Sequence, residues 1–113
     1  MPNLDDAWDG FSDAVQEGAG DLAKNLFSDW QEPAKKDASE FIELAREKLP
    51  KWTEALSQGH LTKSEFNLLI RSLEGLAELN ALKAKGLAKQ KLEQFRVGLI
   101  SLVVNAAFAA VGL

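Results

Sequence analysis

The chain has 113 residues, of which 46% are hydrophobic and 27% charged, so we expect one small domain with a modest core. It contains no cysteine, which excludes disulfides, zinc–thiolate sites and cysteine nucleophiles. The net charge of −4 is unevenly spread: residues 1–50 carry twelve acidic and five basic side chains, whereas residues 51–113 carry five and eight. This asymmetry can steer a partner, or it can reflect attraction between the two halves.

Residues 1–32 are predicted to form an acidic amphipathic helix that starts at an Asn3 cap. Its apolar residues recur at steps of three, four and seven, as on one helix face. They are Leu4, Trp8, Phe11, Val15, Leu22, Leu26 and Trp30. Gly18 and Gly20 favour a bend in the middle, and Pro33 marks the boundary to the next element, because the residue before a proline disfavours helical angles.

Residues 33–58 are predicted to form a second amphipathic helix, which begins near Pro33. Pro50 falls inside its apolar pattern, where it should kink the helix or split it, because proline lacks a donor N–H and clashes with the preceding turn. Gly59 then has the conformational freedom to end the helix in a left-handed conformation.

The junction after Gly59 has the strongest local signal in the chain. Thr62 and Glu65 have the spacing of a capping box, in which each side chain accepts a hydrogen bond from the other residue's amide. Leu61 and Phe66 flank them as a hydrophobic staple. The turn Gly59–Thr62 therefore predicts an antiparallel hairpin of two helices.

From Thr62 to the end there is no proline, so residues 62–113 are predicted to form one long helix. Asn80 and Gly86 are its weak points, and a break at either would instead produce a second hairpin. The predicted fold is all-α: a single domain over residues 1–113, with three to four helices, in which the amphipathic N-terminal helices pack on a long C-terminal helix.

Residues 97–113 carry no charge and are too apolar to be left in water. As a helix they would span about 25 Å, slightly less than the roughly 30 Å hydrocarbon core of a bilayer. Basic residues precede this segment and could face lipid headgroups. They are Lys83, Lys85, Lys89, Lys91 and Arg96.

The two faces of this apolar segment differ. Small or weakly polar residues follow helical spacing on one face, which we expect to pack against another helix, as between copies in an oligomer. They are Gly98, Ser101, Asn105, Ala109 and Gly112. The other face is expected to meet a membrane or a partner, and carries Leu99, Leu102, Val103 and Phe108. Burial inside a soluble bundle is the alternative for the whole segment.

No catalytic, cofactor-binding or metal-binding residues are predicted. His60 is the single histidine and lies in a turn, and no nucleophile has a paired base. The basic stretch is interrupted by Glu93 in an acidic chain, which disfavours nucleic-acid binding, and no small-molecule substrate is predicted.

The sequence therefore predicts a non-enzymatic structural or assembly protein that forms a homo-oligomer through its apolar C-terminal helix. One alternative is a membrane-associated protein, either tail-anchored or membrane-inserting. Another is a soluble helical adaptor that binds a partner helix. The acidic N-terminal residues do not resemble a signal peptide, so we expect the cytoplasm, including its membrane face.

Overall fold

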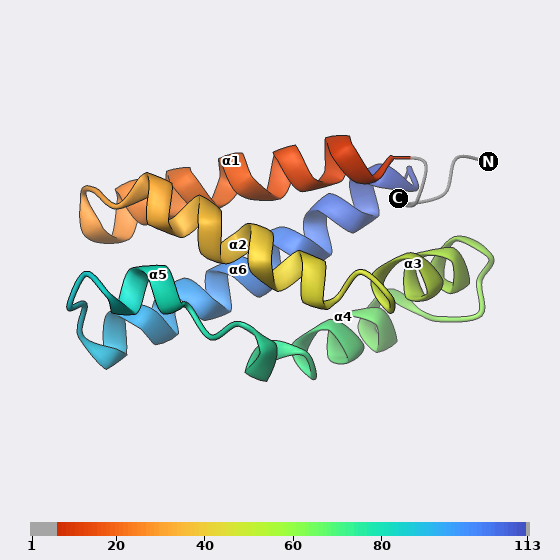
Figure 1. The fold of residues 1–113 in the computed structure, drawn as a ribbon. Coiled ribbons are helices and arrows are strands. Elements are labelled where there is room, and N and C mark those ends of the chain that lie inside the picture. Colours follow the sequence, from red (N-terminus) through yellow and green to blue (C-terminus); the bar gives the residue numbers. More distant parts are fainter. Residues whose placement is uncertain (1–6, 113) are drawn as a thin grey trace.

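The computed structural model describes residues 7–112 as an elongated helical bundle of 42 × 23 × 21 Å (Figure 1). Within this range there are six α-helices and one short 3₁₀ helix: α1 Trp8–Phe27, α2 Gln31–Leu44, α3 Leu49–Ser57, α4 Lys63–Arg71, η1 Glu74–Leu76, α5 Asn80–Lys83 and α6 Lys89–Ala110. The all-α prediction is confirmed, but the predicted three to four helices become six. The predicted Asn3 cap, Leu4 and the terminal Leu113 lie outside the described residues.

Helix α1 is shorter than the predicted helix over residues 1–32, and it is not broken at its glycines. It ends at Phe27 because Ser28 adopts a left-handed backbone conformation, with φ of 63°. Trp30, predicted on the apolar face of the first helix, is instead the N-cap residue of α2 and is also left-handed, with φ of 70°. The chain therefore reverses direction between α1 and α2, and Pro33 lies inside the first turn of α2.

The predicted helix over residues 33–58 is split into α2 and α3. Helix α2 ends at Leu44, and α3 begins at Leu49 with Pro50 in its first turn. A proline costs no hydrogen bond in the first turn, where the amides have no partner within the helix. The chain accommodates Pro50 by starting a new helix rather than by kinking one.

The hairpin of α3 and α4 forms as the sequence predicts (Figure 1). The Thr62 amide donates to Glu65 Oε1 over 2.9 Å, and the Glu65 amide donates to Thr62 Oγ1 over 3.1 Å. Gly59 has φ of 78°, which lets the His60 amide bond back to the Ala55 carbonyl over 2.8 Å. The capping box and the left-handed glycine are both confirmed.

The prediction of one helix over residues 62–113 is wrong, because the chain breaks between α4 and α6. Two positions make this break, Leu79 with φ of 58° and Gly86 with φ of 76°. The Asp37 carboxylate of α2 accepts the amides of Ala81 and Leu82 over 2.9 and 2.8 Å, and so caps α5 from across the bundle. The result is a second hairpin, after which α6 runs back along the molecule.

Helix α6 packs along α1 and also contacts α4, whereas α2 packs mainly on α1 and α5 (Figure 1). The prediction that both N-terminal helices pack on the C-terminal helix therefore holds for α1. Helix α2 instead makes its main contacts with α1 and α5. Large side chains from α1, α2, α4, α5 and α6 are completely buried in the core: Val15, Phe41, Ile42, Phe66, Ile70, Leu82, Phe95, Leu99 and Val103. Much of α6 is thus core of this chain.

Candidate functional site

The predicted small-residue face of α6 lies largely on the surface. Among the described residues after Arg96, the exposed positions are Val97, Ser101, Asn105, Ala109 and Gly112. Four of these five belong to the predicted face. We call this row the α6 strip. It carries no charge, and its part within α6, from Val97 to Ala109, is about 18 Å long at 1.5 Å per residue.

Gly98, the fifth residue of the predicted face, is half-buried and contacts α1. A Cβ atom at Gly98 would lie 2.6 Å from Leu22 Cδ2. Reciprocally, a Cβ at Gly18 of α1 would lie 2.7 Å from Leu102 Cδ2. Each leucine therefore fills the space that a missing side chain leaves on the other helix. The close helix contact predicted for Gly98 exists, but it is made within the chain.

The large apolar face of α6 is directed into the bundle. Leu99 and Val103 are completely buried, and Leu102 and Phe108 are half-buried. The Phe108 ring lies 5.6 Å from that of Phe66 in α4. In this fold these four side chains are covered by the chain itself, so they do not form the exposed membrane or partner surface that the sequence predicted. The reason is that α1 and α4 supply the apolar cover.

A shallow hollow of about 330 Å³ runs along the seam of α1 and α6, beside the α6 strip. Its polar lining is Asp21 and Asn25 from α1 and Ser101 and Asn105 from α6. Amide and hydroxyl groups on both sides can donate and accept hydrogen bonds. The hollow therefore adds polar groups, one of them the Asp21 carboxylate, beside the uncharged surface of α6.

The predicted basic flank gathers at one end of the bundle, because the second hairpin folds α5 beside the start of α6. Lys83, Lys85 and Lys89 are exposed there. Lys91 Nζ donates to the Leu26 carbonyl over 3.2 Å. Arg96 differs from the prediction, since it turns inward: its Nε donates to the Ala77 carbonyl over 2.9 Å, and it pairs with Glu93. It therefore anchors the α5 side of the bundle and does not extend towards solvent.

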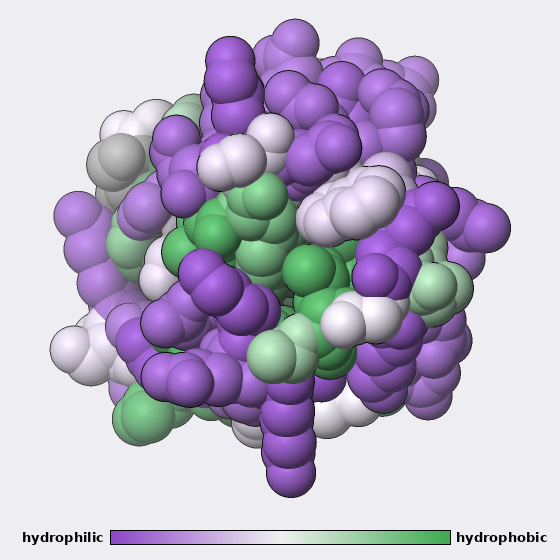
Figure 2. Space-filling view, turned by 90° about the vertical axis from the view of Figure 1, so that its left-hand side faces the viewer, coloured by the Kyte–Doolittle hydropathy of each residue, from purple (hydrophilic) through white to green (hydrophobic). Residues whose placement is uncertain are grey.

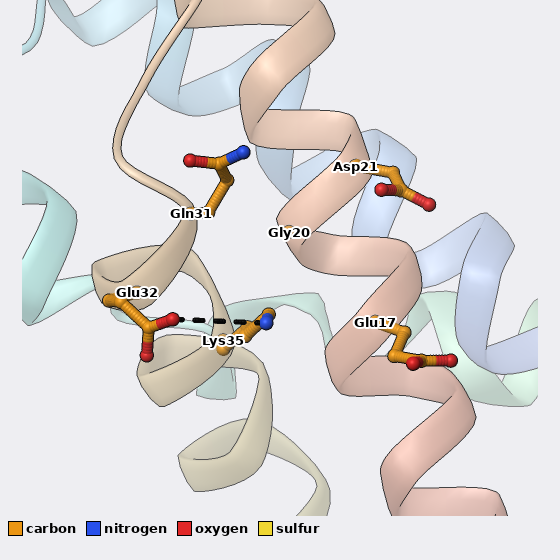
Figure 3. Close-up of a pocket in the computed structure, with 6 residues that line it drawn as sticks. All are labelled: Glu17, Gly20, Asp21, Gln31, Glu32 and Lys35. Atoms are coloured by element: carbon orange, nitrogen blue, oxygen red, sulfur yellow. Dashed lines mark ion pairs between the residues drawn. The ribbon is translucent and has the colours of Figure 1, made fainter.

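A polar groove between α1 and α2 is lined by Glu17, Gly20, Asp21, Gln31, Glu32 and Lys35 (Figure 3). Lys35 pairs with Glu32 over 3.8 Å. Its aliphatic stem covers Gly20, where a Cβ would lie 2.8 Å from Lys35 Cε. Glu17 and Asp21 project from the opposite side of α1, away from this pair (Figure 3). Paired acid–base catalysis requires carboxylates that converge, and these carboxylates do not.

No group of three or more His, Asp or Glu side chains within residues 7–112 could hold a metal ion. His60 is exposed in the α3–α4 turn. Helix α6 is long and apolar enough to cross a membrane by length and composition, although Phe95, Leu99, Ile100 and Val103 in it are buried in the bundle.

Sequence reasoning did not identify Asp37. It is 3% exposed, and burial raises the pKa of its carboxyl above the ordinary value, while the two hydrogen bonds from the Ala81 and Leu82 amides oppose that rise. Its partners lie 44 and 45 residues away in sequence. The sequence signal that could have identified Asp37 is the presence of an acidic residue among the apolar positions of α2.

The chain matches no protein-family model, no curated protein and no solved structure.

Proposed function

We propose that the protein is a non-enzymatic assembly module that forms a homo-oligomer through the α6 strip. The observation that carries this proposal is the strip itself, which is exposed and uncharged over Val97, Ser101, Asn105, Ala109 and Gly112. The exposed face of a helix in a soluble bundle normally carries charged residues. A helix that lacks them on its exposed face is better suited to contact with protein.

The side chains of the strip favour a second helix as the contacting element. Ser101, Ala109 and Gly112 are small, and small side chains allow two helix backbones to approach closely. Asn105 carries both a donor and an acceptor, so it can pair with the same residue of another copy. A twofold arrangement, with two copies of α6 antiparallel, would place Ser101 and Asn105 near the axis and make the contact self-complementary.

Val97 adds apolar area to this contact. Its side chain is 48% exposed, and it lies one helical turn before Ser101. Covering such a side chain removes apolar surface from water and favours association. Glu93, one helical turn before Val97, is exposed and charged, so it bounds the strip at that end.

Light scattering coupled to size exclusion tests the proposal on the full chain, over a concentration series up to several hundred micromolar. We expect a mass that is a multiple of 12.4 kDa. Asn105→Lys should return the protein to a monomer, because a lysine ammonium would be buried in the interface. Gln58→Lys is the matched control, since it places the same charge on an exposed position after α3, outside α6. A wild-type protein that is monomeric throughout would overturn the proposal.

A further inference from the structure

One end of the bundle has an apolar centre within a polar ring. It is the end formed by the α1–α2 turn, α5, the connection over residues 84–88 and the first turn of α6. Figure 2 shows apolar atoms gathered and hollowed at the middle of this face, surrounded by hydrophilic side chains. The apolar side chains on these elements that remain partly exposed are Leu26, Phe27, Trp30 and Leu87.

Trp30 lies at this end of the bundle, as the N-cap residue of α2. Its backbone is left-handed, a conformation that is unfavourable for a residue with a Cβ. The Asp29 carboxylate accepts the Trp30 amide over 2.7 Å and fixes the turn. Lys85 Nζ lies 5.3 Å from the centre of the indole ring. The indole is therefore kept at the end of the molecule, with a cation over its face.

Lysines surround this apolar centre. Lys83, Lys85, Lys89 and Lys91 follow one another without an acidic residue between Glu78 and Glu93, and Lys24 comes from the last turns of α1. Within residues 7–112, none of these lysines has a carboxylate oxygen within 4.0 Å. Asp29 and Glu32 are the acidic residues on the α1–α2 side of this end. Lys83 also lines a hollow with Glu74 and Glu78, but the other four lysines outnumber Asp29 and Glu32, so the end is positive in a chain of net charge −4.

We propose that this lysine-ringed end docks on the surface of a bilayer containing anionic lipid. Trp and Leu side chains settle at the level of the headgroups, while lysine stems lie along apolar surface and place their ammonium groups among the phosphates. Each lysine near an anionic leaflet adds to the attraction. The combination of an apolar centre and a basic ring matches both parts of a lipid surface.

The charge distribution also orients the molecule. Asp9 and Asp13 lie in the first two turns of α1, at the end opposite the lysine ring (Figure 1). A negative membrane repels that end and attracts the other, so the bundle meets the surface end-on. This docking leaves α6 folded in the bundle and its exposed strip clear of the lipid. It therefore does not depend on self-association, and either can fail without the other.

Flotation of the full chain with vesicles tests the docking. We expect binding to vesicles of phosphatidylcholine with 30% phosphatidylserine, none to pure phosphatidylcholine, and release at 0.5 M salt. The double variant Lys85→Gln/Lys89→Gln should partition roughly 25-fold more weakly, at about fivefold for each lysine. Lys51→Gln/Lys63→Gln is the matched control and should bind like wild type. Like the test variant, which removes the contact of Lys85 with Trp30, this control variant removes one cation–π contact, because Lys63 Nζ lies 5.5 Å from the Phe108 ring centre.

Tryptophan fluorescence then locates the contact. Brominated lipid chains should quench wild-type emission, Trp30→Phe should lose most of that quenching, and Trp52→Phe should keep it, because Trp52 lies in α3 at the other end of the bundle. Circular dichroism checks that each variant is folded. Equal binding to neutral vesicles, wild-type binding by the Lys85/Lys89 variant, or salt-resistant insertion would each overturn end-on docking.

Discussion

The Asp37 carboxylate offers the most direct test of how the second hairpin is formed. Replacing it by alanine removes the acceptor for the amides of Ala81 and Leu82. Leu82 is fully buried, so its amide cannot turn to water, and an unsatisfied buried amide costs about 1–3 kcal/mol. Ala81 is half-buried, and its amide adds about 1 kcal/mol, since water can reach part of it.

We therefore expect Asp37→Ala to lower the free energy of unfolding by about 2–4 kcal/mol. Urea unfolding at pH 7, followed by far-ultraviolet circular dichroism, measures this difference. Glu43→Ala is the control, because Glu43 is exposed on the same helix and should change the stability little. Amide hydrogen exchange should also speed up at Ala81 and Leu82. A loss below 0.5 kcal/mol with unchanged exchange would refute the view that Asp37 caps α5.

Three further changes test other local devices of the fold. Burial raises the pKa of Asp37, so the folded state binds the proton of this carboxyl more tightly than the unfolded state does. The stability gained from that protonation is fully present below the unfolded value of 3.8 and is lost as pH rises through the folded value, so the stability of wild type relative to Asp37→Asn should increase on acidification. Urea titrations at several pH values measure this, and a constant difference would contradict it. Thr62→Ala should lower the free energy of unfolding by about 1 kcal/mol because it removes the cap, and Ser64→Ala is the control. Thermal unfolding measures both variants, and equal losses of stability would mean that the capping box is irrelevant. Gly98→Val should cost about 1–3 kcal/mol by overpacking against Leu22, and unchanged stability would mean that α1 and α6 are not closely packed there.

Features that depend on neighbouring residues were predictable from the sequence. The Thr62–Glu65 box and the left-handed Gly59 involve partners within a few residues, so their chemistry can be derived from spacing alone. Pro50 marked a break for the same reason. The uncharged character of α6 was equally clear, because it is a property of composition.

The orientation of α6 was not predictable in this way. Its apolar face and its small-residue face were both identified, but whether they would meet another molecule or be buried inside the bundle was left open. Leu99 and Val103 are instead covered by the chain, and Gly98 is filled by Leu22. Periodicity tells which residues share a helix face, but it does not tell which other element covers that face.

The sequence by itself determined the all-helical class, the α3–α4 hairpin and the apolar C-terminal helix, because each follows from backbone preferences and local side-chain chemistry. The tertiary structure decided that the region after Thr62 breaks, at or next to the weak points Asn80 and Gly86, and it decided which side of α6 faces water. The break depends on Asp37, whose hydrogen bonds reach 44 and 45 residues along the chain. Helix propensity, which is summed over neighbouring residues, cannot include such a contact. A buried carboxylate needs hydrogen-bond donors, and α2 does not supply them, so Asp37 takes them from the start of α5. The same second hairpin brings the lysines of α5 and α6 beside Trp30 and leaves the α6 strip exposed.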